Sequence, residues 1–264
     1  MKNIFKKHNY YLLREFVRTD FKLRYQGSVL GYLWSLLRPL ALFTILYIVF
    51  SKFLKLGASI PHYPAYLLLG IVVWTYFQEA SMLGLRAIVD KGELIRKTNV
   101  PKFILVLSTS FSAFVNLIIN LVVFGVFLLL SGAEIHWGAL LLPLILIELL
   151  IFSGAVSFFL AALYVKFRDI SYIWEVMMQL LFYATPIIYP LAIIPTKYQK
   201  ILLMNPLAQM IQYLRSVMVT SKTPTTGKLI YGPLSLAPFV VVIVVTYIAV
   251  IYFRMQSRMF AEEI

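Results

Sequence analysis

Long apolar runs separated by short polar segments dominate the sequence. Six such runs stand out, at residues 33–54, 66–85, 103–130, 140–165, 173–189 and 236–253. A helix needs roughly 20 apolar residues to cross a hydrocarbon core of about 30 Å, and five runs come close to that length. The fifth, 173–189, is shorter and ends in prolines. The pattern predicts an all-α integral membrane protein with six transmembrane helices, of which the fifth is short.

No internal repeat and no segment of soluble-domain size interrupts these runs. We therefore expect one transmembrane domain over residues 1–264. It divides into an N-terminal cytoplasmic or interfacial segment (1–32), six spans (33–253) and a cytoplasmic tail (254–264).

Composition agrees with this class of protein. The chain is 61% hydrophobic and only 13% charged, whereas soluble domains are closer to half apolar and a quarter charged. The absence of cysteine excludes disulfides and thiolate metal sites. The formal net charge of +13 does not indicate nucleic-acid binding, because the basic residues lie between the apolar runs and do not form one basic domain. Membrane lipids are the partners that this distribution suits.

The distribution of lysine and arginine also predicts the orientation. Basic residues are dense before the first run and in the loops after the second and fourth, and sparse in the first and third loops. The loop after the fifth run is basic too, but long loops weigh less in the positive-inside rule. We expect a multi-pass membrane protein with both termini in the cytoplasm.

Within residues 1–32, apolar and basic positions follow helical spacing. Leu12, Leu13, Phe16, Val17 and Phe21 fall on one side of a helical wheel, and Arg14, Arg18 and Lys22 recur on another. This pattern predicts an amphipathic helix at the cytoplasmic membrane surface. Asp20 breaks the pattern. A plain positively charged anchor is the alternative.

The loop at residues 90–101 mixes charged residues with Leu94, Ile95 and Val100. It is too short for a domain. A short helix of this composition presents an apolar knob and a charged rim to a partner protein, and an ordinary solvated connector is the alternative.

No catalytic constellation is present in the sequence. His8, His62 and His136 lie far apart without metal-ligand spacing, and no phosphate-binding G-x-x-x-x-G-K-[ST] motif occurs. Glu148 lies within a span, where a carboxylate is by default a functional candidate; the alternative is a protonated group or one bonded to a neighbouring helix. Ser153, Ser157 and Ala161 recur every four residues, as expected for close helix packing.

The end of the fifth run is unusual. Its TPIIYP sequence (185–190) breaks the helix, and irregular backbone at membrane depth is tolerated only where protein or a watery cavity covers it. We predict a re-entrant element there, followed by short external helices on either side of Asn205-Pro206. Aromatic rings stack on sugars, and the channel or gate candidates are Trp74, Tyr76, Phe77, Phe182, Tyr183, Pro186, Tyr189 and Pro190.

Four motifs in this order resemble one family. They are RTDFKLRYQGSVLGYLW (18–34) running into LRP (37–39), KTNVPK (97–102), FRD (167–169), and TPIIYP (185–190) followed by Asn205-Pro206. Together they cover essentially the whole chain and resemble the type-2 ABC exporter permeases. The resemblance is narrower to those that export O-antigen, capsule or wall teichoic acid.

The resemblance implies a homodimer that binds two copies of a separate cytoplasmic ABC ATPase subunit. That subunit would hold ATP and Mg, so this chain would carry no cofactor and would not be an enzyme. The substrate would be a glycan or polyol-phosphate polymer linked to undecaprenyl diphosphate.

The resemblance also assigns residues. The ATPase-coupling loop would comprise Asp90, Glu93, Leu94, Ile95, Arg96, Lys97 and Pro101, and a second cytoplasmic contact Phe167, Arg168 and Asp169. Basic residues at the substrate entrance would be Arg18, Lys22, Arg24 and Arg38, which suit an anionic linkage. The fifth span would be the re-entrant gate.

Three alternatives remain open at this point. An exporter of drugs or unlinked lipids shares the fold. An ion-coupled lipid flippase would use Glu148 as its coupling site. A membrane-embedded transferase would need convergent catalytic residues that the sequence does not supply.

Overall fold

The computed structural model of the chain describes residues 7–25, 30–31, 33–55, 60–98, 100–132, 137–230 and 232–263. Throughout these residues the secondary structure is helical, without a strand, which confirms the predicted all-α class. The α-helices are α1 (Lys7–Tyr25), α2 (Leu33–Tyr47), α3 (Tyr63–Arg86), α4 (Gly92–Lys97), α5 (Lys102–Leu130), α6 (Leu142–Lys166), α7 (Ile170–Ala184), α8 (Thr196–Leu202), α9 (Pro206–Met218), α10 (Thr226–Leu229), α11 (Ala237–Gln256) and α12 (Phe260–Glu263). Short π or 3-10 turns are η1 (Ile48–Phe53), η2 (Trp137–Leu141), η3 (Leu191–Ile193) and η4 (Gly232–Leu236).

Five helical segments in the described chain are long and apolar enough to cross a membrane. They are Leu33–Phe53, Tyr63–Arg86, Lys102–Leu130, Gly138–Lys166 and Gly232–Gln256, and each coincides with a predicted apolar run. The other predicted span corresponds to α7, which has 15 residues. At 1.5 Å per residue α7 is about 22 Å long, less than a hydrocarbon core. That the fifth run crosses the membrane therefore stays a prediction, whereas the shortness of its helix is confirmed.

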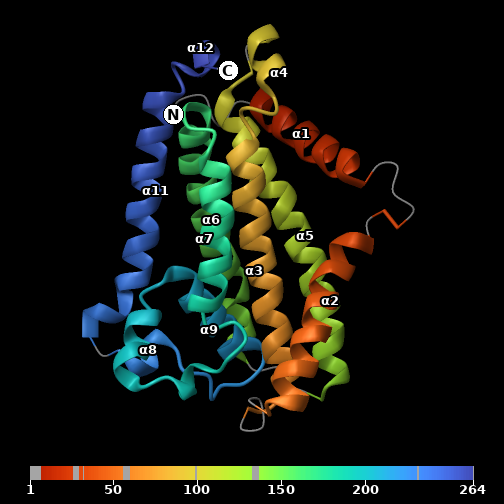
Figure 1. Ribbon diagram of the computed structural model, residues 1–264, viewed down its shortest axis with the longest axis vertical. Helices are drawn as coiled ribbons and strands as arrows, with labels where there is room; N and C mark the ends of the chain where they lie inside the picture. The colour runs from red at the N-terminus through yellow and green to blue at the C-terminus, as the bar shows by residue number, and fades with distance from the viewer. Residues whose placement is uncertain are drawn as a thin grey trace.

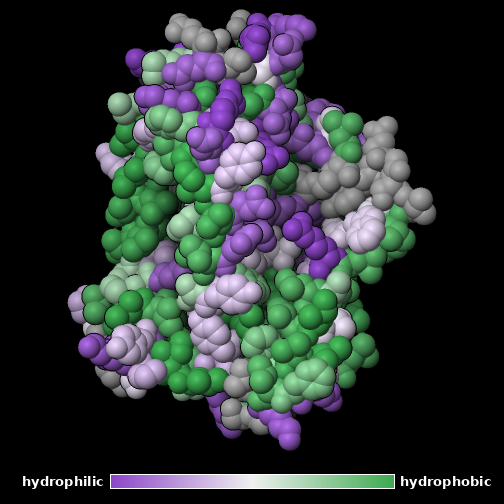
Figure 2. Space-filling model, viewed as in Figure 1, coloured by the Kyte–Doolittle hydropathy of each residue, from purple (hydrophilic) through white to green (hydrophobic). Residues whose placement is uncertain are grey.

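Helix α3 is the centre of the bundle (Figure 1). It packs against α2, α5, α6, α7 and α9. In its most apolar stretch 72% of the residues are buried, compared with 6% for the first span and 17% for the last. The outer helices expose large apolar side chains, such as Ile45 on α2 and Ile243 on α11. Hydrophobic residues cover both flanks of the molecule, while the end that carries α4 is mostly hydrophilic (Figure 2). Such surfaces suit contact with lipid chains or with other membrane helices.

Small residues set the spacing between α3 and α6. Ser153, Ser157 and Ala161 are fully buried along α6, and Ser157 Oγ donates to the carbonyl of Ala80 at 3.0 Å. A Cβ added at Gly84 would lie 2.3 Å from that of Ser157. The predicted packing role of this serine and alanine series is confirmed.

Helix α1 packs along α5 near the end of the bundle that carries α4 (Figure 1). Its basic residues Arg14, Arg18 and Lys22 are exposed, while Leu12, Leu13 and Phe16 are partly buried. The helix is therefore two-sided as predicted. Its placement at a membrane surface stays a prediction.

Candidate functional site

Helix α4 is a short projecting helix between α3 and α5. Glu93 in its first turn and Arg96 and Lys97 in its last complement the helix dipole, and Lys97 pairs with Glu93 at 2.9 Å. All three are exposed, as is Asp90 in the preceding turn. The outward face of α4 is therefore charged.

The apolar residues of this loop point the other way. Ile95 is buried and belongs to a small core cluster with Ile88, Leu105 and Val165, against which the half-buried Leu94 and Val100 pack. The apolar knob that the sequence suggested for a partner protein is thus used to seat α4 on its own bundle. Only the charged rim faces outward, and Pro101 directly precedes α5.

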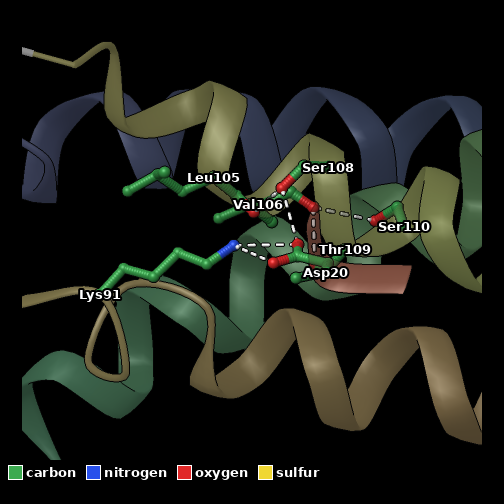
Figure 3. Close-up of polar contacts among 7 residues, drawn as sticks. All are labelled: Asp20, Lys91, Leu105, Val106, Ser108, Thr109 and Ser110. Atoms are coloured by element: carbon green, nitrogen blue, oxygen red, sulfur yellow. Dashed lines mark hydrogen bonds and ion pairs between the residues drawn. The ribbon is translucent and has the colours of Figure 1, made fainter. Parts of the chain in front are cut away.

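A salt bridge fastens α1 to the turn before α4 (Figure 3). Lys91 Nζ lies 2.9 Å from Asp20 Oδ2 and 3.0 Å from Oδ1, and the two side chains are only 20% and 18% exposed. The ammonium also lies 5.2 Å from the centre of the Phe16 ring, a cation–π contact. These contacts join the α3–α4 turn to α1.

Helix α5 completes this junction (Figure 3). Ser108 Oγ lies 3.3 Å from Asp20 Oδ2 and 2.9 Å from the carbonyl of Leu105, so its single proton serves one acceptor or the other. Thr109 and Ser110 next to it donate to the carbonyl of Val106 within the helix. Asp20 thus contacts both the α3–α4 turn and α5.

Sequence reasoning missed this junction, because Asp20 looked like a defect in the amphipathic pattern of α1. The signal was present: α1 is a basic helix, and a carboxylate that breaks its amphipathic pattern has a reason to be there. Its partner, Lys91, lies 71 residues away, so helical periodicity within α1 does not identify it.

The predicted second contact lies between α6 and α7. Phe167, Arg168 and Asp169 are all exposed. Because α5, α6 and α7 run alternately up and down the bundle, this turn lies at the same end as α4 (Figure 1). Arg168 Cζ is 5.4 Å from the ring centre of Tyr164. The two candidate contacts therefore share one end of the molecule.

The predicted entrance residues lie on two helices. Arg18 and Lys22 are one turn apart on α1 and exposed, and Arg38 is exposed on α2. The side chain of Arg24 lies outside the described residues. Their joint role stays a prediction.

At the opposite end, the chain after α7 folds back into the protein. Thr185, Pro186, Ile187, Ile188 and Pro190 are buried, and Tyr189 is half-buried. Irregular backbone of this kind leaves carbonyl groups without helical partners. Residues 185–190 are called the gate segment below.

Side chains of α9 and α3 satisfy the carbonyls of the gate segment. Arg215 on α9 is fully buried, and its Nη1 and Nη2 donate to the carbonyls of Pro186 and Ile187, each at 2.6 Å. Tyr63 Oη donates to Ile188 O at 2.7 Å. Arg215 Nε also donates to Tyr66 O at 3.0 Å, so one arginine joins the gate segment to the central helix.

From the sequence, Arg215 was only one of several basic residues in the long loop after the fifth run, and no role was predicted for it. Yet it lies one turn after Ile211 on the apolar side of α9, where a cation needs a specific partner. That spacing was the available signal. The two predicted short helices on either side of Asn205 are present as α8 and α9, and the Asn205 side chain caps α9 by accepting from Leu207 N at 3.0 Å. Their position outside the membrane stays a prediction.

The aromatic candidates divide by position. Trp74, Tyr76 and Phe77 are buried in the core of the chain, where Phe77 stacks on Phe152 at 5.5 Å and Tyr76 Oη lies 2.6 Å from Ser153 Oγ. Phe182 is half-buried, with its ring centre 5.6 Å from that of Trp74. Tyr183 is 68% exposed. Packing accounts for the three α3 residues, and Tyr183 is the candidate whose ring faces outward.

Glu148 contacts a neighbouring helix. The side-chain amide of Gln209 is oriented with its nitrogen toward two acceptors. This nitrogen donates to Glu148 Oε1 and to Pro206 O, each at 3.2 Å. The carboxylate also lines an apolar groove between α6 and α11. This contact agrees with the alternative that Glu148 is bonded to a neighbouring helix, here α9.

Comparison with known proteins agrees with this arrangement. The sequence pattern of the ABC-2 type transporter family matches residues 11–219, most of the chain and every element from α1 to α9 apart from the first residues of α1. The chain belongs to the ABC-2 type transporter family.

Individual relatives are similar over nearly their whole length. An O-antigen export system permease protein RfbA of Klebsiella pneumoniae is 32% identical over 255 residues, 95% of this chain and 94% of the relative. A second K. pneumoniae permease of that name is 30% identical with the same coverage. One from Myxococcus xanthus is 28% identical over 96% of this chain and 95% of its own length. Within the ABC-2 family, these relatives are transport proteins.

Proposed function

We propose that this chain is the transmembrane permease of an ABC exporter that carries an O-antigen-type polysaccharide across the bacterial cytoplasmic membrane. The observation that carries the proposal is the similarity to O-antigen export permeases over about 95% of the chain. Five helices capable of crossing a membrane and a charged helix projecting from one end of the bundle are consistent with it. The chain moves its substrate without covalent chemistry.

The energy source is a separate ATPase subunit, which holds ATP and Mg. Two copies of it bind a permease homodimer at the end formed by α4 and the α6–α7 turn. The exposed Glu93, Arg96 and Lys97 on α4 and Arg168 in the turn supply polar contacts for such a partner. Both α1 and α12 lie at this end (Figure 1), which agrees with cytoplasmic termini under the positive-inside rule.

The salt bridge between Lys91 and Asp20 transmits the motion. When ATP binding displaces α4, the turn that contains Lys91 moves with it, and the ion pair moves α1. Because Asp20 also contacts Ser108, the displacement reaches α5. A motion of α1 changes the position of Arg18 and Lys22, the proposed contacts for the diphosphate of a lipid-linked glycan.

The gate segment controls the far side. Its carbonyls are held by Arg215 and Tyr63, so opening requires α7 and α9 to move together or these bonds to break. Trp174 Nε1 on α7 donates to Ser81 Oγ on α3 at 3.0 Å. Tyr183, with its ring outward, is positioned to contact sugar.

The test is to purify the chain alone and after co-expression with the ATP-binding protein encoded beside it. We expect no ATPase activity from the chain alone and a stable, active complex on co-expression. Reversing the charged rim with Arg96→Glu and Lys97→Glu is expected to release the ATPase while the permease remains folded. Arg258→Glu, in the tail after α11, is the charge-reversal control for each of the two single changes. Failure of any ATPase to associate would argue against the proposal.

A cellular test addresses the substrate. In a strain that lacks its own O-antigen permease, the complex is expected to restore surface polysaccharide when the matching glycan is made. Intact ATPase coupling without surface polysaccharide would instead favour an exporter of drugs or unlinked lipids.

A further inference from the structure

A cavity of about 610 Å³ lies between α5, α6 and α11, near the end of the bundle that carries α4. It is separate from the junction at Asp20 and from the gate segment, because none of the residues of those sites lines it. Its volume lies within the usual range for small-molecule sites. The lining residues are Val100, Pro101, Lys102, Phe103, Leu107, Phe158, Val250, Phe253, Arg254 and Ser257.

The two charged residues of the cavity are both cationic. Lys102 is the first residue of α5 and Arg254 lies in the last turn of α11. Lys102 Nζ donates to the carbonyl of Ser257, which leaves two of its three protons for another acceptor. Within the described part of the chain the exposed guanidinium of Arg254 has no ion pair. Among the described residues that line the cavity there is no carboxylate to neutralise these charges.

The apolar lining lies deeper along the same helices. Leu107 is five residues beyond Lys102 on α5, and Val250 four residues before Arg254 on α11. At 1.5 Å per residue, these side chains are about 6–8 Å further from the end of the bundle. Phe158 and Phe253 pack edge to face beside them, with ring centres 4.9 Å apart.

This gradient matches one kind of molecule. Both α5 and α11 belong to segments that can cross a membrane, so their cationic ends lie at headgroup depth and the apolar lining at the depth of acyl chains. An anionic phospholipid has its charge and its chains in that order, and Lys and Arg bind phosphate readily. A second protein would not need a cationic rim above an apolar floor.

We propose that this cavity binds an anionic phospholipid of the cytoplasmic leaflet, with its phosphate between Lys102 and Arg254 and an acyl chain against Leu107 and Val250. The lipid fills the gap between α5 and α11 and is not the transported molecule. In Figure 1, α11 lies on the side of the bundle opposite α2 and the outer end of α1, which carry the proposed entrance residues. The proposal holds for any cargo.

The experiment is native mass spectrometry of the full-length protein released from nanodiscs of phosphatidylglycerol or of phosphatidylcholine. We expect retained lipid from phosphatidylglycerol nanodiscs and little from phosphatidylcholine. Arg254→Gln and Lys102→Gln are each expected to weaken retention about fivefold, the equivalent of about 1 kcal/mol for one cation near an anionic lipid. Leu107→Trp, which fills the apolar floor without changing charge, is expected to lower retention as well.

Arg258→Gln is the matched control, because Arg258 is exposed after α11 but does not line the cavity. Arg254 is exposed, and among the described residues its side chain makes no hydrogen bond or ion pair. We therefore expect its replacement to leave the fold intact, as a wild-type gel-filtration profile would verify. Equal retention in the wild type and Arg254→Gln, or equal retention of the two lipids, would overturn the proposal. Displacement by undecaprenyl diphosphate at lower concentration than phosphatidylglycerol would reassign the cavity to the substrate lipid. If inorganic phosphate alone displaced the bound phospholipid, the cavity would be a phosphate site and the proposed acyl-chain contact would be wrong.

Discussion

The guanidinium carbon of Arg215 lies 3.5 Å from the centre of the Tyr66 ring, and its Nε donates to the backbone carbonyl of the same tyrosine at 3.0 Å. The other two nitrogens donate to Pro186 and Ile187. A buried charge is tolerated only with such compensation. Three segments that are distant in sequence therefore depend on one side chain.

Replacing Arg215 with methionine is expected to destabilise the protein strongly. The carbonyls of Tyr66, Pro186 and Ile187 would lose their donors, at a cost of about 3–5 kcal/mol in all. Arg215→Lys keeps the charge but not the planar fork, so we expect an intermediate loss. The stability of both variants is measured as the midpoint of thermal unfolding in detergent, monitored by size-exclusion chromatography. Lys222→Met, at an exposed position after α9, is the control; equal midpoints for Arg215→Met and this control would contradict the expectation.

Gly70 on α3 makes room for the same arginine. A Cβ at this position would lie 2.4 Å from Arg215 Nη2, so Gly70→Ala forces the guanidinium away from its carbonyl acceptors. We expect Gly70→Ala to cost stability in the wild-type chain and much less in an Arg215→Met background. The coupling between the two changes should fall within about 0.5–3 kcal/mol, as for residues in direct contact. Additive effects on the unfolding midpoint would show that the glycine serves another purpose.

Neutralising Asp20 is expected to uncouple ATP hydrolysis from export more than it destabilises the protein. The pair with Lys91 is largely shielded from solvent, so its loss should cost about 1–2 kcal/mol, between the values for exposed and buried pairs. In the co-expressed complex, Asp20→Asn should retain ATPase binding but export less polysaccharide per ATP hydrolysed.

Two further variants make this test specific. Glu15→Gln removes an exposed carboxylate from the same helix and is expected to behave as the wild type. Exchanging the charges with Asp20→Lys and Lys91→Asp together should restore part of the export that either change alone removes. A charge exchange no better than the single variants, with all of them folded, would argue against transmission through this ion pair.

The spans were predictable because each depends on a local property. The apolar runs located α3, α5, α6 and α11 to within a few residues, since the length of a hydrophobic stretch fixes where a membrane helix can lie. The prolines after Ala184 likewise indicated where α7 ends. The small residues on α6 indicated a close helix contact, but the structure was needed to show that its partner is α3.

The contacts that join these helices were not predictable in the same way. Asp20 looked anomalous within α1, and Arg215 looked ordinary within its basic loop. Lys91 lies 71 residues from Asp20, and Tyr66 lies 149 residues from Arg215. The aromatic residues of α3 show the reverse case. Trp74, Tyr76 and Phe77 suggested a channel by composition, but their burial depends on α5, α6 and α7, which no local pattern reveals.

Glu148 is expected to tolerate replacement by glutamine. The side chain of Glu148 accepts from Gln209 on α9 when that amide is oriented toward it, and a glutamine at 148 retains an oxygen that can accept the same bond. Polysaccharide export per folded protein should therefore stay close to the wild-type value in Glu148→Gln. Glu148→Leu, which has no acceptor, should lower the unfolding midpoint because the Gln209 amide loses a partner.

The comparison of these two variants separates the remaining functions. An ion-coupled flippase needs a carboxylate that gains and loses a proton, and glutamine cannot do so. Loss of export in Glu148→Gln with normal stability and normal ATPase activity would therefore assign a transport role to the carboxylate. Normal export in Glu148→Gln together with a destabilised Glu148→Leu leaves Glu148 as a hydrogen-bonded link from α6 to α9, the helix whose Arg215 holds the gate segment.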